Sequence, residues 1–329
     1  MMTLSTLWAL DRHIDPDTGR SPIADALAAH WDHDPGSVRF FRTSANSIYR
    51  LTRNQRTAYL RIAPDSERSR QHIERELDLL AWLTAQGIPV VQPIPAQSGA
   101  LVVTGDSPLG LLHAVMFDAL DGRQMDVDAL TADSACTWGA TVGRLHAVLA
   151  SAPDRFRGRP AGWHAALDAV ASGHYPVPAV PAEARRLRAM LAKVPKTAAT
   201  YGLIHTDLEL DNLVWNGDDV AILDVDEFGD GWYLLDIAKA LTDLLDNGET
   251  VESPRIAAFV DGYRQHHPLD DVALASLPDF LALSEFRGYM SLVRAVDMEP
   301  EDAEVDWLRD LAARFRAGMA EYEAGLAAR

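Results

Sequence analysis

Lysine is nearly absent from this chain of 329 residues. Three of the 30 basic residues are lysine (Lys193, Lys196 and Lys239), and residues 1–192 contain none. Any N-terminal site that needs a basic side chain must therefore use arginine, which stays charged and binds oxyanions through a planar fork.

Cysteine, long apolar runs and positive charge are also scarce. The single cysteine, Cys136, excludes an internal disulfide and a cysteine-rich zinc site. No run approaches the roughly 18 to 20 apolar residues of a membrane-spanning helix. Residues 1–9 have no basic n-region before an apolar stretch, so we expect no secretory signal and a cytoplasmic protein. The net charge of −18 argues against nucleic-acid and membrane partners, and it leaves room for metal ions and cationic substrates, although it also serves solubility.

The sequence pattern changes from strand-like to mostly helical near residue 118. Residues 37–117 contain short β-branched and aromatic runs between polar turns, with apolar residues at helical spacing over 71–86. A partly helical segment, 1–36, precedes them, and the chain after residue 118 is mostly helical in pattern. We predict an α+β fold with an N-terminal lobe at 1–117, built on a small antiparallel sheet with one helix, and a larger, mostly helical C-terminal lobe at 118–329.

Acidic residues concentrate in one segment. Between His205 and Asp236 there are ten acidic residues and no lysine or arginine. Such carboxylates raise one another's pKa unless cations neutralise them. A purely solvated acidic loop does not fit the apolar strand pattern at 220–223. The segment predicts a divalent metal site, and magnesium typically takes one or two carboxylates plus substrate phosphates.

The spacing within this segment matches the needs of phosphoryl transfer. That reaction requires a group that orients the attacking hydroxyl and oxygen ligands for metal ions. Asp207 fits the first role, and Asn212 follows it by five residues. Asp224 comes twelve residues later, at the end of a predicted strand. The order His-x-Asp-x4-Asn, then a strand ending in Asp, is typical of protein kinases and their relatives.

Three stretches resemble the aminoglycoside phosphotransferase and choline kinase superfamily, which has a protein-kinase-like fold of two lobes. They are 203–214, 221–229 and 235–238. The resemblance covers about residues 38–290, and the C-terminal part looks most similar to the homoserine kinase and stress-response Ser/Thr kinase branch. It implies ATP and Mg²⁺ as cofactors.

The resemblance also implies roles for residues of the acidic segment. Asp207 would be the catalytic base, and Asn212 and Asp224 would bind magnesium. Asp226 would either reach the metal, directly or through water, or cap the turn. His205 and Asp236 would brace the loop. Glu209 would accept a substrate amine or face solvent.

In the N-terminal lobe the resemblance implies a nucleotide site. Relatives carry a lysine on the third strand that holds phosphates and pairs with a glutamate; the matching residues here are Arg61 and Glu76. The alternative is a surface arginine on an edge strand. The loop 42–48 lacks glycine, and it either binds phosphate or forms an ordinary hairpin turn. The hinge at 116–122 would bind adenine through its main chain. These further nucleotide-binding candidates are Ser44, Asn46, Ser47, Phe117 and Ala119.

The sequence therefore predicts a phosphotransferase that moves the γ-phosphate of ATP to a hydroxyl group. The small-molecule acceptor is expected to be an aminoglycoside, an amino alcohol or a hydroxy amino acid. A Ser/Thr protein kinase of the stress-response type and a nucleotide-binding pseudokinase without turnover are the alternatives. The sequence does not indicate an oligomeric state.

Overall fold

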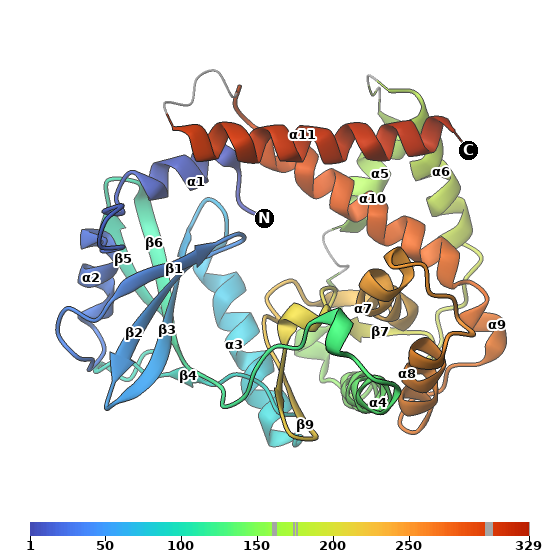
Figure 1. Ribbon diagram of the computed structural model, residues 1–329, viewed down its shortest axis with the longest axis horizontal. Helices are drawn as coiled ribbons and strands as arrows, with labels where there is room; N and C mark the ends of the chain where they lie inside the picture. The colour runs from blue at the N-terminus through green and yellow to red at the C-terminus, as the bar shows by residue number, and fades with distance from the viewer. Residues whose placement is uncertain (160–162, 174, 176, 300–304, 329) are drawn as a thin grey trace. The chain divides into compact units, whose positions relative to one another are not determined.

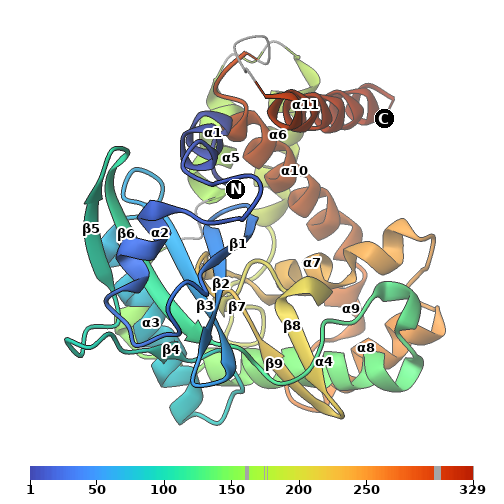
Figure 2. The same ribbon diagram turned by 60° about the vertical axis from the view of Figure 1, so that its left-hand side comes forward.

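The computed structural model describes residues 1–159, 163–173, 175, 177–299 and 305–328 (Figures 1 and 2). Its internal contacts divide the chain into two compact units. The first unit comprises residues 1–81, 91–119 and 289–321, and the second comprises 82–90, 120–288 and 322–329. The first unit thus includes a C-terminal segment that the sequence assigned to the helical lobe, and the division into lobes at residues 117 and 118 stays a prediction.

The first unit contains a six-stranded antiparallel sheet. Its strand order is β1-β2-β3-β6-β4, and β5 pairs with β6. The strands are β1 (Arg39–Thr43), β2 (Ser47–Arg53), β3 (Arg56–Pro64), β4 (Pro93–Ile94), β5 (Val103–Ser107) and β6 (Gly110–Asp118). Asn54 and Gln55, with φ of 49° and 63°, make the two-residue turn between β2 and β3, as a tight hairpin requires. The predicted small antiparallel sheet is confirmed.

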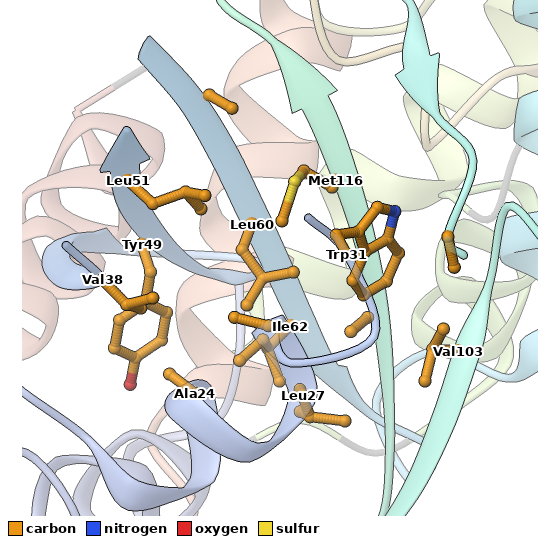
Figure 3. Close-up of a cluster of buried hydrophobic side chains, with 14 of the residues drawn as sticks. Ala24, Leu27, Trp31, Val38, Tyr49, Leu51, Leu60, Ile62, Val103 and Met116 are labelled. Atoms are coloured by element: carbon orange, nitrogen blue, oxygen red, sulfur yellow. The ribbon is translucent and has the colours of Figure 1, made fainter. Parts of the chain in front are cut away.

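One face of this sheet packs on helix α2 (Pro22–Ala28). Leu60 and Ile62 of β3 are fully buried in a core that also contains Trp31 (Figure 3). Trp31 satisfies its indole N–H by donating to the carbonyl of Ile94 at 2.7 Å. The strand alternation places Arg61 on the opposite face, where helix α3 (Arg70–Ala85) supplies its partner.

A second apolar cluster of the first unit joins the two ends of the chain. Helix α1 (Leu4–Asp11), which the sequence pattern did not reveal, buries three leucines against Leu308 and Ala312 of α11 (Asp306–Ala327). The side chain of Thr3 caps α1 by accepting from the N–H of Thr6 at 3.3 Å.

Over its described residues, the second unit is mostly helical, with four short strands. The strands form two antiparallel pairs, β7 with β10 and β8 with β9. The strands are β7 (Tyr201–Ile204), β8 (Leu213–Asn216), β9 (Asp219–Ile222) and β10 (Gly229–Trp232). The helices are η1 (Val127–Ala129), α4 (Ala132–Leu149), η2 (Asp154–Phe156), α5 (Trp163–Ser172), α6 (Ala179–Leu191), η3 (Leu210–Asn212), α7 (Tyr233–Asp246), α8 (Pro254–Arg264) and α9 (Asp271–Leu274), with the first part of α10 (Leu277–Ala295).

Helices α4 and α8 approach each other closely because glycine lies at their contact. A Cβ at Gly139 would lie 1.9 Å from the carbonyl oxygen of Phe259, and one at Gly262 would lie 2.0 Å from that of Cys136. The two glycines therefore allow the backbones of α4 and α8 to pack directly against each other. Within the described residues, no helix combines the length and apolar character needed to cross a membrane.

Candidate active site in the second unit

Short strands bring the predicted catalytic and metal-binding residues together. His205 directly follows β7, Asn212 ends η3, and Asp224 comes two residues after β9. The main chain of Leu223 joins all three segments: its N–H donates to the carbonyl of Asn212 at 2.8 Å, and its carbonyl lies 2.9 Å from Nε2 of His205. The structure therefore gathers residues that lie up to 19 positions apart in the sequence.

Asp207 and Asn212 are hydrogen-bonded to each other. Nδ2 of Asn212 donates to the main-chain oxygen of Asp207 at 2.8 Å and to its Oδ2 at 3.0 Å. The Asp207 side chain is 43% exposed, whereas Asn212 is buried. An oriented carboxylate that solvent can still reach suits a group that accepts a proton from a bound hydroxyl. Because the amide nitrogen of Asn212 is committed to Asp207, its Oδ1 is the atom suited to a metal ion.

Asp236, in the first turn of α7, holds the backbone of this loop. Its carboxylate accepts from the N–H of His205 at 2.8 Å and from the N–H of Thr206 at 2.7 Å, and Nε2 of His146 lies 3.0 Å away. Burial raises the pKa of Asp236, but the hydrogen bond and electrostatic interaction with His146, with the contacts of His205, outweigh it and lower the pKa below its usual value. These contacts are what a brace requires.

Two residues of the site have left-handed backbone conformations although neither is glycine. The φ angles are 77° at Thr206 and 57° at Asp224. Such conformations persist only where the surroundings hold them, and they are common at functional sites. At Thr206 the support includes NH1 of Arg287, from α10, which donates to the Thr206 carbonyl at 2.9 Å. The sequence analysis assigned no role to Thr206 or Arg287.

Positive charge reaches the acidic segment from other positions on the chain. Nζ of Lys239 donates to Oε1 of Glu209 and lies 3.6 Å from Oδ1 of Asp207. A guanidinium nitrogen of Arg287 lies 4.0 Å from a carboxylate oxygen of Glu227. Lys239 and Arg287 thus supply part of the positive charge that neutralises the acidic segment, and the divalent metal site stays a prediction. Glu209 does not simply face solvent, because Lys239 is its partner.

The candidate metal ligands suit a site that is completed by a substrate. Asp226 is 4% exposed, and Asp224 is partly buried. Among the described residues, no group of three or more His, Cys, Asp or Glu side chains forms a ready-made metal cage. Magnesium commonly binds through one or two carboxylates and takes its remaining ligands from phosphates and water. The oxygen donors Asn212, Asp224 and Asp226 fit such an ion.

A chain of buried polar rings continues behind Asp236. Oη of Tyr263 lies 2.9 Å from Nδ1 of His146 and 3.0 Å from Nδ1 of His267. Burial raises the pKa of Tyr263 well above its usual value, and burial lowers the pKa of His267 to about 4. His146 therefore links Tyr263 of α8 to the carboxylate of Asp236, which holds the loop.

The nucleotide-site candidates of the first unit

Arg61 and Glu76 form a buried ion pair in the first unit. NH1 and NH2 of Arg61 donate to the two carboxylate oxygens of Glu76 at 2.8 and 2.6 Å. Arg61 is 6% exposed, Glu76 is 1% exposed, and the guanidinium lies 5.1 Å from the ring centroid of Phe117. Strand β3 lies between β2 and β6, so the alternative of a surface arginine on an edge strand is wrong.

The loop between β1 and β2 is a tight turn. The N–H of Ser44 donates to the carbonyl of Asn46 at 3.1 Å, and the hydroxyls of Thr43 and Ser47 lie 3.2 Å apart. Of the three predicted phosphate-binding residues, Ser44 is exposed, whereas Asn46 and Ser47 are buried. Their role in nucleotide binding stays a prediction.

The predicted hinge uses part of its main chain within the sheet. Phe117 pairs with Tyr59 of β3, and the N–H of Ala119 donates to the carbonyl of Thr57 at 3.2 Å. The carbonyl of Ala119 is then a better candidate for adenine than its N–H. Nucleotide binding by Phe117 and Ala119 also stays a prediction.

Similarity to known proteins

A family model described as "Phosphotransferase enzyme family" matches residues 37–272. Amicoumacin kinase of Bacillus subtilis is 24% identical over 289 residues, which are 84% of this chain and 85% of that protein. A homoserine kinase of Methylobacillus flagellatus is 27% identical over 265 residues, covering 78% of this chain and 75% of the relative.

A solved structure, amicoumacin kinase hAmiN in complex with AMP-PNP, Ca²⁺ and Ami, has a similar fold. It superposes with a TM-score of 0.75 at 23% identity, covering 95% of each chain. This likeness confirms the predicted α+β, protein-kinase-like fold.

Proposed function

The chain belongs to the phosphotransferase enzyme family, and we propose that it transfers the γ-phosphate of ATP to a hydroxyl group of a small molecule. Its relatives include small-molecule kinases, one named for amicoumacin and another for homoserine. Nothing in these similarities favours a protein acceptor. The cytoplasm, where ATP is abundant, remains the expected location.

The observation that carries the proposal is the geometry of Asp207 and Asn212. Asn212 fixes one carboxylate oxygen of Asp207, and the side chain is still 43% exposed. An acceptor hydroxyl within about 2.6–3.2 Å of this carboxylate would be oriented for attack on phosphorus and would pass its proton to Asp207. The brace from Asp236 keeps the loop backbone in place during this step.

ATP and Mg²⁺ are the proposed cofactors. The complex of the structural relative with AMP-PNP and Ca²⁺ supports a nucleotide and a divalent cation. When bound, magnesium neutralises charge on the phosphates. In the second unit, Asn212 and Asp224 would hold the ion, with Asp226 as a further ligand. In the first unit, the candidates for holding the nucleotide are Arg61, Glu76, Ser44, Asn46, Ser47, Phe117 and Ala119.

An acceptor that carries both a hydroxyl and an amine is the class that we propose. Beside the 205–212 loop, an open cavity of about 570 Å³ is lined by four acidic side chains, those of Asp126, Asp128, Asp211 and Asp243. Carboxylates raise the local concentration of cations. Amino alcohols, hydroxy amino acids and aminoglycosides all carry both a hydroxyl and an amine.

The test is ATP consumption across a panel of these acceptors with the wild type, Asp207→Asn and a matched control, Asp218→Asn. Asp218 is an exposed acid in the turn between β8 and β9. We expect Asp207→Asn to lower kcat by about 10³-fold, because general base catalysis contributes roughly 10²–10⁴-fold, and the control to match the wild type. If MgATP binds but no acceptor gives turnover above Asp207→Asn, the chain is a pseudokinase and the proposal is wrong.

A further inference from the structure

Lys239 lies next to the proposed base for a structural reason. It follows Asp236 by three residues on α7, so the two side chains project from the same face of that helix. Asp236 holds the backbone of the catalytic loop at His205 and Thr206. One face of α7 therefore carries both the carboxylate that binds the loop backbone and the ammonium group that contacts the side chains of Asp207 and Glu209.

The contacts of Lys239 leave it a hydrogen-bond donor. An ammonium group has three N–H bonds. One bonds to Oε1 of Glu209, and a second faces Oδ1 of Asp207 at 3.6 Å. The third is available to a substrate, and the Lys239 side chain is 24% exposed, so solvent can reach it.

This third donor lies close to where the reacting atoms would be. Oδ2 of Asp207 is bonded to Asn212, which favours Oδ1 as the oxygen that meets the acceptor hydroxyl. Lys239 is on the side of Oδ1. In a productive complex the attacking oxygen lies about 3–3.5 Å from phosphorus, so the ammonium group and the phosphoryl oxygens would be neighbours.

We propose that Lys239 is a catalytic residue that donates a hydrogen bond to the transferring phosphoryl group, and that Glu209 positions it. This inference rests on the proposed function. In the transfer, a bond forms between the acceptor oxygen and phosphorus while the bond from phosphorus to the β,γ-bridging oxygen breaks. The bonding electron pair leaves with ADP, and the acceptor proton passes to Asp207. Lys239 keeps its protons throughout and stabilises the negative charge on the phosphoryl oxygens.

The role of Glu209 follows from the same contact. Lys239 neutralises the carboxylate of Glu209 through Oε1, so Glu209 attracts a substrate amine less strongly than an unpaired acid would. Glu209 and Asp207 both contact the ammonium group of Lys239, and Glu209 is the closer of the two acids. Without Glu209, Lys239 would pair with Asp207 alone and would hinder the base.

The experiment compares Lys239→Met with Lys193→Met, another lysine of the second unit, which is exposed. Steady-state kinetics are measured with the best acceptor of the panel and also with water as the acceptor, which requires no identified substrate. For Lys239→Met we expect kcat to fall by about 10²-fold, as when one donor to a transition-state oxyanion is removed, while the KM for ATP changes less than about threefold. Lys193→Met should behave as the wild type.

Chemical rescue separates catalysis from structural support. In Lys239→Ala, added methylammonium should restore part of kcat, whereas tetramethylammonium, which has no N–H, should not. The proposal is overturned if Lys239→Met keeps kcat within threefold, if only KM changes, or if both ions act equally. It is also overturned if Lys239→Met improves kcat/KM for amine-bearing acceptors, because Glu209 would then be an amine site.

A failure of the proposed function would look different. If Asp207→Asn also retained full activity, or if the wild type hydrolysed no ATP and phosphorylated no acceptor, the transferase assignment itself would fail. A large effect of Asp207→Asn together with a small effect of Lys239→Met refutes only the role of Lys239.

Discussion

The first unit and the second unit stabilise their buried charges in different ways. In the first, Arg61 and Glu76 form a bidentate pair, and the ring of Phe117 lies against the guanidinium. In the second, the carboxylate of Asp236 accepts two backbone N–H groups and contacts a histidine. Each arrangement is suited to its place: the pair joins a strand to a helix, whereas the network fixes the backbone of a loop.

This difference predicts different responses to mutation. Removing one member of a buried ion pair leaves the other charge without that partner, and a second substitution can cancel that penalty. Removing the centre of a network leaves several donors without an acceptor, and no single second substitution can satisfy them. Double mutants therefore distinguish the two arrangements.

The largest effect is expected for Asp236→Ala. The N–H groups of His205 and Thr206 lose their acceptor, and each buried unsatisfied donor costs about 1–3 kcal/mol. We expect the free energy of unfolding to fall by about 3–5 kcal/mol and turnover to be lost, measured by urea denaturation and ATP consumption. The control Asp246→Ala removes an exposed acid from the same helix and should change stability by less than about 0.5 kcal/mol. Equal stability of the two variants would show that Asp236 is not a brace.

Arg61→Met should have the next largest effect. It leaves Glu76, only 1% exposed, as an unpaired buried carboxylate, and we expect a loss of about 3 kcal/mol. The double variant Arg61→Met/Glu76→Leu should recover most of that stability. If the pair also serves the nucleotide, the double variant will bind MgATP at least about tenfold more weakly by calorimetry. Recovered stability with unchanged affinity would remove both residues from the nucleotide site.

The two units also differ in how much the sequence could predict. The strands of the first unit follow from local alternation. Arg61 was identified by its match to the lysine of related proteins, and the alternation with Leu60 and Ile62 set only the face of the strand on which it lies. In the second unit, Asp207 and Asn212 were found because they lie on one short loop with recognisable spacing. Local patterns suffice where the partners share one element.

The rest of the candidate site depends on contacts between distant segments. His146 meets Asp236 across 90 positions, and Arg287 meets Thr206 across 81. Packing of separate helices creates these contacts, so neither periodicity nor motif spacing reports them. Lys239 is an intermediate case: its spacing of three from Asp236 places both side chains on one helical face, but Lys239 lies beyond the acidic segment that ends at Asp236.

Gly139→Ala should have a smaller effect, which tests the support behind the network of the second unit. The new methyl group would lie 1.9 Å from the carbonyl oxygen of Phe259, so α4 and α8 must separate. We expect a loss of about 1–3 kcal/mol, the usual cost of overpacking, together with reduced turnover. Gly288→Ala is the matched control, because a Cβ there meets nothing within 4 Å and alanine favours the helix by about 1 kcal/mol. A neutral Gly139→Ala would mean that the helix contact does not support the loop.

The smallest expected effect is a pH dependence that arises in the second unit. Burial lowers the pKa of His267 to about 4 in the folded protein, whereas an unfolded histidine titrates near 6.5. Between these values the unfolded chain binds more protons, so the free energy of unfolding falls as the pH drops from about 6.5 towards 4. One such histidine should lower the free energy of unfolding by about 1 kcal/mol between pH 7 and pH 5.5, as measured by urea denaturation at each pH. Asp236 acts at more acidic pH than His267. Its pKa is lowered in the folded protein, so its contribution to stability is lost only as the pH falls below the ordinary pKa of an aspartate. His267→Gln should therefore flatten the curve above pH 4, whereas His266→Gln, at the exposed neighbouring position, should leave it unchanged. If both variants keep the slope of the wild type, the buried ring chain behind Asp236 is not what makes stability depend on pH.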